Sequence, residues 1–127
     1  MDMSVRGIRG AITADSNEER PILDATLEVL QGIVADNGID PEDICSVMIT
    51  VTADLDAAFP AKAIREMDGW ELVPLMCSVE VPVKGSLERC IRLMLMVNTD
   101  RTQREIRHVY MKGARALRPD LSGTSAP

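Results

Sequence analysis

The feature that constrains this fold most is one run of apolar residues at helical spacing. Other segments of the chain have the two-residue period of strands. The members of the apolar run are Leu23, Leu27, Leu30 and Val34, with Thr26 and Ile33 beside them. The spacing predicts one long helix that packs on a core, begins at a cap supplied by Ser16 or Asn17, and ends near Gly38. The strand-like segments are residues 4–13, 45–52, 70–76 and 87–97. Because several of them follow one another without a long helix between, we expect an α+β fold with a mixed sheet.

Short helices complete the predicted set of elements. Pro60 stands where proline is favoured, at the start of a helix, and predicts a short helix over residues 61–67. Residues 102–107 favour a second short helix, whereas residues 108–117 fit neither period clearly. The expected architecture is therefore a mixed sheet with one long and one or two short helices.

The length of 127 residues corresponds to one domain. We expect this domain to occupy residues 1–121, and the small polar residues 122–127 to form a disordered tail. A chain of this size has little room for a deep ligand pocket within one subunit, and the apolar face of its sheet needs cover. Both considerations favour a homo-oligomer with a site at a subunit boundary.

Charge and residue content exclude several classes of function. With a formal charge of −6 and 2% aromatic residues, the chain lacks the basic face and the stacking side chains that nucleic acid requires. Cys45, Cys77 and Cys90 lack metal-ligand spacing and His108 is the only histidine, so we expect no metal site and no disulfide framework. Reduced thiols favour the cytoplasm. We expect no membrane association, because no apolar stretch reaches the length of a span and the first ten residues lack the apolar core of a signal peptide.

Two charged residues stand where a strand normally carries apolar side chains. Glu80 lies between Val79 and Val81 in an alternating segment, and Arg92 interrupts the apolar run CIRLMLMV. A charge that a sheet partly buries needs a partner. The residues alone favour the interpretation that the two charges neutralise each other or face solvent on one face of the sheet. With the motifs described below, we expect them instead to form opposite walls of one pocket and to interact through a ligand.

The polar residues at unexpected positions are rich in cations although the protein is acidic. The set is Arg9, Lys62, Arg65, Cys77, Glu80, Arg92, Tyr110 and Arg118. Arginine binds carboxylates through two parallel hydrogen bonds and stays charged when partly desolvated, so the set predicts a small polyanion as ligand. The sequence has no Ser/His/Asp set and no phosphate-binding glycine loop. An enzyme built from these residues is expected to use no cofactor and no covalent intermediate.

Several motifs, in order along the chain, resemble one known family. They are RGIRGA at residues 6–11, DLDAAFPAKAIRE at 54–66, Cys77 with Glu80, CIR at 90–92, RHVY at 107–110 and ALRPDL at 116–121. In these residues the chain resembles the monofunctional, trimeric chorismate mutases of the α/β-barrel class. The resemblance implies a homotrimer in which the mixed sheets assemble into a pseudo-α/β-barrel, with active sites at the subunit interfaces.

The resemblance also implies a reaction. Chorismate mutases rearrange chorismate to prephenate on the route to phenylalanine and tyrosine, in one pericyclic step that breaks an ether bond while a carbon–carbon bond forms. By this resemblance Arg92 lies at the ether oxygen, where negative charge grows, Glu80 accepts a hydrogen bond from the ring hydroxyl, and Arg9 holds a carboxylate. These three residues are the expected catalytic set.

The remaining site residues are assigned by the same resemblance to substrate binding. Tyr110 packs and hydrogen bonds near Arg9, and Cys77 lines the region of the ring hydroxyl beside Glu80. Leu117 and Arg118 close the site from the carboxyl end. The neighbouring subunit is expected to present Phe59, Ala61, Lys62 and Arg65.

Two hypotheses from other classes remain open. One is a trimeric module that binds a small carboxylate without catalysis. The other is a trimeric deaminase of similar outline that acts on imines. The combination of Glu80 and Arg92 with RGIRGA and FPAKAIRE favours the mutase over both.

Overall fold

The structure, a computed structural model, describes residues 3–122. The strands within this range are β1 (Ser4–Thr13), β2 (Ile44–Val51), β3 (Leu75–Val79), β4 (Cys90–Thr99) and β5 (Val109–Tyr110). The α-helices are α1 (Glu19–Asn37), α2 (Ala61–Arg65) and α3 (Pro119–Ser122), and the 3-10 helices are η1 (Pro41–Asp43), η2 (Gln103–Glu105) and η3 (Lys112–Ala116). None of the described helices is both long enough and apolar enough to cross a bilayer.

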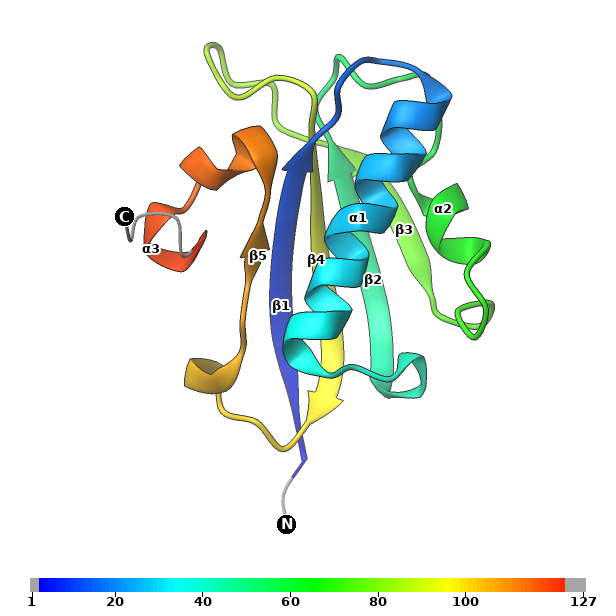
Figure 1. Ribbon diagram of the computed structural model, residues 1–127, viewed down its shortest axis with the longest axis vertical. Coiled ribbons are helices and arrows are strands. Elements are labelled where there is room, and N and C mark those ends of the chain that lie inside the picture. The colour runs from blue at the N-terminus through cyan, green and yellow to red at the C-terminus, as the bar shows by residue number, and fades with distance from the viewer. Residues whose placement is uncertain (1–2, 123–127) are drawn as a thin grey trace.

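All five of these strands form one mixed sheet in the order β3-β2-β4-β1-β5 (Figure 1). The central strand β4 is antiparallel to β1 and to β2, whereas β5 runs parallel to β1 and β3 runs parallel to β2. The predicted α+β class with a mixed sheet is thus confirmed.

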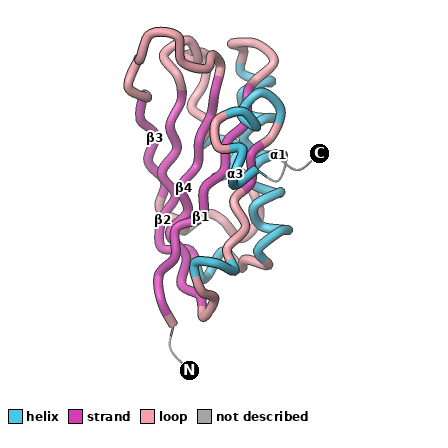
Figure 2. Tube along the Cα trace, turned by 90° about the vertical axis from the view of Figure 1, so that its left-hand side faces the viewer, coloured by secondary structure: helices cyan, strands magenta, loops and turns pink. Residues whose placement is uncertain are grey.

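Helix α1 covers one face of the sheet, and the molecule has two layers (Figure 2). Ile8 and Ile12 of β1 are buried with Val29 and Ile33 of α1 in the main apolar core. Side chains alternate between the two faces of a strand, so the intervening odd-numbered residues of β1 point to the opposite face. That face carries the half-exposed or exposed methionines Met48, Met76 and Met94. We refer to it as the open face.

The start of α1 differs from the prediction. The N-cap is Glu18, whose side chain makes no capping hydrogen bond. Asn17 instead binds the loop after β2: its Nδ2 donates to Asp56 Oδ1 at 2.8 Å and its Oδ1 accepts from the main-chain N–H groups of Asp56 and Ala57. A cap at Ser16 or Asn17 is therefore wrong, because contacts with a distant loop occupy Asn17. The predicted end of the helix is confirmed, since Gly38 has the left-handed φ of 60° that favours glycine.

Two strand boundaries also differ from the prediction. Strand β3 begins at Leu75 rather than Trp70, because the N–H groups of Trp70 and Val73 form turn hydrogen bonds to Met67 and Trp70. Strand β4 begins at Cys90, because Arg89 adopts a φ of 49° and donates its N–H to the Asp54 carboxylate.

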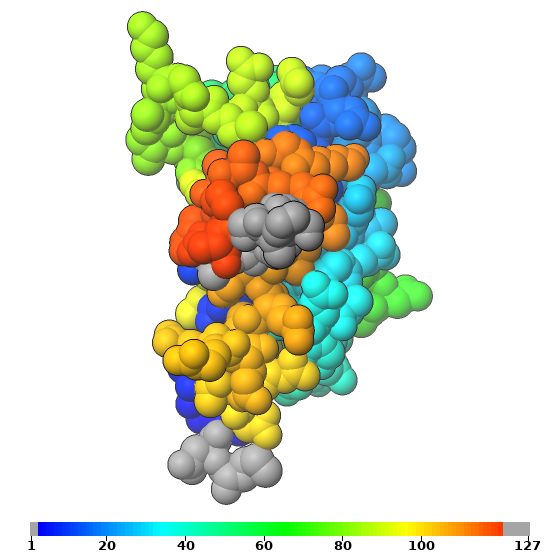
Figure 3. All heavy atoms as spheres, turned by 60° about the vertical axis from the view of Figure 1, so that its left-hand side comes forward, coloured from blue at the N-terminus to red at the C-terminus, as the bar shows by residue number. Residues whose placement is uncertain are grey.

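The carboxyl-terminal third contains short elements. Of the predicted helix over residues 102–107, one 3-10 turn forms, Gln103–Glu105, with Thr102 and Glu105 making a capping box. Residues 108–117, left open by the sequence, contain β5 and η3. The predicted disordered tail lies outside the described residues except for Ser122, which ends α3. The segment joining β3 to β4 projects from one end of the molecule, yellow-green in Figure 3.

Candidate active site

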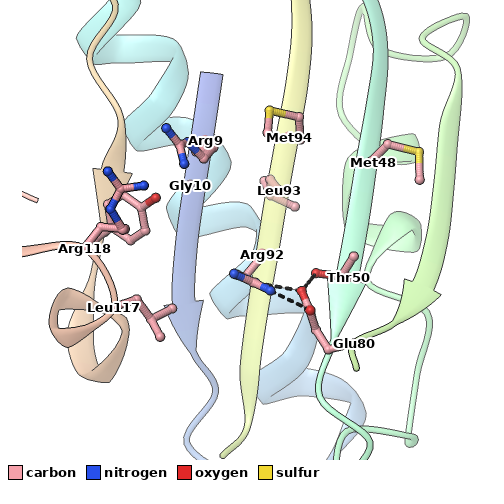
Figure 4. Close-up of a pocket in the computed structure, with 11 residues that line it drawn as sticks. Arg9, Gly10, Met48, Thr50, Glu80, Arg92, Leu93, Met94, Leu117 and Arg118 are labelled. Carbon is pink, nitrogen blue, oxygen red and sulfur yellow. Dashed lines mark hydrogen bonds and ion pairs between the residues drawn. The ribbon is translucent and has the colours of Figure 1, made fainter. Parts of the chain in front are cut away.

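A cavity of about 430 Å³ lies on the open face of the sheet. Strands β1, β2 and β4 form its floor, Glu80 one wall and the carboxyl-terminal segment the other (Figure 4). The residues that line it are Arg9, Gly10, Met48, Thr50, Glu80, Arg92, Leu93, Met94, Tyr110, Leu117 and Arg118. Six of the predicted site residues are therefore brought together: Arg9, Glu80, Arg92, Tyr110, Leu117 and Arg118.

Strand register places the polar side chains on this floor. Arg92 of β4 lies between Ala11 of β1 and Thr50 of β2. Residues directly opposite on neighbouring strands point to the same face, so all three face the cavity side. Ala11 is small, and Tyr110 and Leu117 pack beside it in a minor apolar cluster. The sheet thus presents a guanidinium flanked by a methyl group and a hydroxyl.

Glu80 and Arg92 contact each other directly. Glu80 Oε1 lies 2.5 Å from Arg92 Nη2, and Glu80 Oε2 accepts a hydrogen bond from Arg92 Nε at 2.7 Å. The hydroxyl of Thr50 donates to the same Oε2. The expectation that the two charges interact only through a ligand is wrong in this structure, because the side chain of Glu80 folds back over β2 to reach Arg92.

The electrostatics of the cavity favour an anion. Hydrogen bonds from Arg92 hold the pKa of Glu80 below its ordinary value of 4.5, and the hydroxyl of Thr50 lowers it further against the opposing effect of burial. The carboxylate of Glu80 in turn raises the pKa of Arg92. Arg9 and Arg118 lie on the other side of the cavity (Figure 4). Three guanidinium groups therefore face one carboxylate among the lining residues.

His108 lies outside this cavity and contacts the main chain of Arg9, one of the residues that line it. Its Nδ1 accepts a hydrogen bond from the main-chain N–H of Arg9 at 2.9 Å. Burial, together with the nearby charges of Arg9 and Arg118, lowers the pKa of His108 below 6.5. A neutral imidazole that accepts at Nδ1 is consistent with a structural role rather than with proton transfer.

A second cavity of about 580 Å³ contains the other predicted binding residues. Phe59, Lys62, Arg65 and Cys77 line it. Cys77 pairs with the buried Ile49 and packs against the main core, so it faces away from the side that carries Thr50. Its predicted position beside Glu80 is therefore wrong within one chain, because alternation along β3 turns it to the helix side.

Ala61 also departs from its predicted place. Its side chain is 4% exposed and belongs to the main core, where the first turn of α2 packs. Phe59, by contrast, is 73% exposed at the mouth of the second cavity. Lys62 Nζ lies 3.3 Å from Glu19 Oε2. One chain thus presents two separate groups of predicted site residues.

Sequence reasoning missed five lining residues, Gly10, Met48, Thr50, Leu93 and Met94. Thr50, Met48 and Met94 project from the predicted strands into the first cavity. Thr50 carried a usable signal, since it is one of two hydroxyl-bearing residues, with Ser46, that share the parity of Met48 in a largely apolar strand. Its contact with Glu80 depended on strand order, which a local pattern does not contain.

The described residues offer no cluster that suits a metal. Residues 3–122 contain no group of three or more His, Cys, Asp or Glu side chains able to hold an ion. The cavity donors are guanidinium groups, which bind anions rather than cations. The arrangement is suited to fixing a small anionic molecule and to stabilising negative charge near Arg92.

Comparison with known proteins is consistent with this geometry. The family described as chorismate mutase type I matches residues 5–121. Chorismate mutase AroH of Bacillus subtilis (strain 168) is 48% identical over 122 residues, which cover 96% of each chain. Chorismate mutase AroH of Thermus thermophilus is 49% identical over 118 residues, 92% of this chain and 96% of the relative.

A solved structure is similar as well. Chorismate mutase from Clostridium thermocellum superimposes with a TM-score of 0.85 at 48% sequence identity, covering 87% of this chain and 98% of that one. The resemblance stated from the motifs is thereby confirmed. The match of the family over residues 5–121, together with relatives of this identity over nearly the full length, shows that the chain belongs to the type I chorismate mutases and is an isomerase.

Proposed function

We propose that the first cavity is where this mutase rearranges chorismate to prephenate, with Arg92, Glu80 and Arg9 as its catalytic residues. The observation that carries this proposal is the placement of three guanidinium groups and one carboxylate around one cavity. Substrate and product are dicarboxylates, so two guanidinium groups can bind the carboxylates while a third acts at the reacting bond.

Arg92 is positioned to stabilise the transition state. Negative charge grows on the ether oxygen as the bond breaks, and a fixed cation there binds the transition state better than the substrate. Glu80 accepts from Nε and one N–H of Nη2 of Arg92, so among the described contacts Nη1 and the second N–H of Nη2 are left to donate to the substrate. The ion pair keeps the guanidinium in place before the substrate arrives.

The other lining residues restrict the substrate. Arg9 and Arg118 bind carboxylates from the opposite wall, and Tyr110 and Leu117 pack against the folded molecule. Holding a flexible substrate with its reacting carbons close together removes much of the entropic barrier. The mechanism needs no proton transfer, no metal and no covalent intermediate.

The second cavity completes the site from a neighbouring copy in a homotrimer. Phe59, Lys62, Arg65 and Cys77 face away from Arg92 within one chain, so they reach a substrate at Arg92 only in an assembly. The methionines of the open face supply apolar surface for such an assembly, since Met48, Met76 and Met94 are 38%, 65% and 36% exposed. Packing three open faces together gives the barrel-like trimer that the sequence favoured.

Loss of the ultraviolet absorbance of chorismate on mixing with the purified protein tests the activity directly. Saturable, enzyme-dependent loss with prephenate as product is the expected result. Binding of chorismate without turnover would indicate the carboxylate-binding module, and turnover of imines alone would indicate the deaminase. We propose the cytoplasm as the site of the reaction, because the free thiols of Cys45, Cys77 and Cys90 fit a reducing compartment.

A further inference from the structure

We infer that Thr50 is a positioning residue of this active site, whose hydroxyl holds the Glu80 carboxylate in the orientation that meets both Arg92 and the ring hydroxyl of the substrate. The inference rests on the proposed roles of Glu80 and Arg92. It adds a residue that neither the motifs nor the charge pattern of the sequence assigned.

The position of Thr50 in the sheet makes this contact possible. Thr50 lies on β2, opposite Arg92 of β4 on one side and Ser78 of β3 on the other. Glu80 follows the end of β3, and its main-chain N–H donates to the carbonyl of Val51 at 2.8 Å. Strand β2 therefore holds Glu80 twice, by its main chain through Val51 and by its carboxylate through Thr50.

The hydrogen bonds around the carboxylate are shared unequally. Glu80 Oε1 contacts Arg92 Nη2, whereas Oε2 accepts from both Arg92 Nε and the hydroxyl of Thr50 (Figure 4). Glu80 and Arg92 are both long side chains, and the Arg92 side chain is 50% exposed. An ion pair between two such chains loses much of its benefit to the entropy of ordering them.

Thr50 supplies a rigid anchor that the ion pair lacks. A β-branched side chain has few χ1 rotamers, and its main chain here is fixed between two neighbouring strands. The Thr50 hydroxyl thus holds Glu80 Oε2 in one position. Arg92 then binds a carboxylate whose orientation is already fixed. Valine would keep the shape and strand preference of threonine while removing only the donor.

Three variants test the inference on the full-length protein. Thr50→Val removes the hydroxyl, Thr50→Ser keeps it, and Ser46→Ala removes a hydroxyl from the same face of β2 outside both cavities. We expect Thr50→Val to lower kcat/KM for chorismate about tenfold, as for loss of a hydrogen bond to a charged group, with Thr50→Ser and Ser46→Ala within about twofold of the unsubstituted enzyme. Thr50→Ala serves as the second hydroxyl-free variant if the valine chain does not fold.

A second readout does not depend on activity. The titration of Glu80 is followed in the substrate-free enzyme by ¹³C NMR of labelled glutamate carboxyl groups, with Glu80→Gln to assign the signal. Loss of a hydrogen bond to the ionised form raises a carboxyl pKa, so the midpoint should move to higher pH in Thr50→Val and stay in place in Ser46→Ala. The charged groups around the cavity, Arg92 from β4, Arg9 from β1 and Arg118 beyond β5, are the same in every variant.

The outcomes separate this inference from the proposed function. A Thr50→Val enzyme with unchanged kcat/KM and an unmoved Glu80 midpoint would overturn the inference and leave the function intact. Reduced kcat/KM with an unmoved midpoint would also overturn it, because Thr50 would then contact the substrate itself. An unsubstituted enzyme that does not consume chorismate would overturn the function, while the titration would still decide the contact between Thr50 and Glu80.

Discussion

At the scale of single residues, the proposed chemistry depends on the geometry of one guanidinium. Arg92 gives two of its nitrogens to Glu80 and retains a third for the substrate. Lysine carries the same charge but has a single donor atom on a flexible stem. It can therefore keep the ion pair or reach the ether oxygen, but not both in fixed geometry.

Replacing Arg92 should strongly reduce turnover. We expect Arg92→Ala, and also Arg92→Lys, to lower kcat by about 10²-fold or more, the usual loss when a preorganised donor to developing charge is removed. Steady-state rates with chorismate measure this effect, and thermal denaturation of both variants serves as the folding control. Near-native kcat in Arg92→Lys would contradict the proposed role.

Protonation of Glu80 should lower the activity of the enzyme in acid solution. Its pKa is lowered from 4.5 by Arg92, so the carboxylate is ionised above that pH and becomes protonated only as the pH falls through the lowered value. Its contribution to stability is likewise present above pH 4.5 and lost below, since the unfolded chain takes up the proton first. We expect kcat/KM to be flat above pH 4.5 and to fall in more acid solution.

The variant Glu80→Gln is the control for this pH dependence. It has a lower rate but no carboxyl group to titrate, so the acid limb should be missing from its profile. An identical acid limb in Glu80→Gln would assign the pH dependence to another group. The first candidate is Asp120, because it forms an ion pair with Arg118 of the cavity, and this pairing lowers its pKa.

At the scale of elements, close contact of α1 with β1 fixes the floor of the cavity. Gly10 lies beneath α1, where an added Cβ would overlap the δ-methyl of Ile33 and come within 3.2 Å of Val29 Cγ2. The neighbouring Arg9 points to the open face and into the cavity. The distance between α1 and β1 on the helix side of the sheet therefore affects where the Arg9 side chain lies on the open face.

A methyl group at Gly10 should destabilise the protein. We expect Gly10→Ala to lower the free energy of unfolding by about 1–3 kcal/mol, as for overpacking of a core. Adding Ile33→Val, which removes the overlapping methyl group, should recover part of this loss. Chemical denaturation measures both, and unchanged stability in Gly10→Ala would show that α1 can shift without cost.

At the scale of the whole molecule, the two cavities of one chain are each half of the proposed site. Arg92 faces the open side of the sheet, and Lys62 and Arg65 line the cavity beside α2. A composite site predicts that defects in different halves complement each other. Such complementation is expected for a site between subunits and is not expected for a site within a single chain.

Mixed assemblies provide the measurement. Chains with Arg92→Ala and chains with both Lys62→Ala and Arg65→Ala should each have low activity. Refolded together in equal amounts, they should regain activity, because about a quarter of the sites in randomly assembled trimers would combine two intact halves. Two differently tagged Arg92→Ala chains form the control mixture, and a mixture no more active than its components would contradict the interfacial site.

The sequence by itself determined the elements and the chemistry of the site. Hydrophobic period located α1, β1 and β2 to within a few residues, because side-chain direction in a helix or strand follows from local geometry. Charged residues in apolar strands identified Glu80 and Arg92, since such positions are costly without a function or a partner. The order of the motifs identified the family.

Only the tertiary structure decided which of these residues meet. Strand order and register place Thr50 beside Arg92, and the packing of the loop after β2 near the start of α1 brings Asn17 to Asp56 instead of the helix cap. The hydrogen bonds of Asn17 to Asp56 and Ala57 join residues 39 and 40 positions apart, a separation that no local pattern spans. A periodic pattern fixes the face on which a side chain lies, whereas its partner depends on how separate strands align.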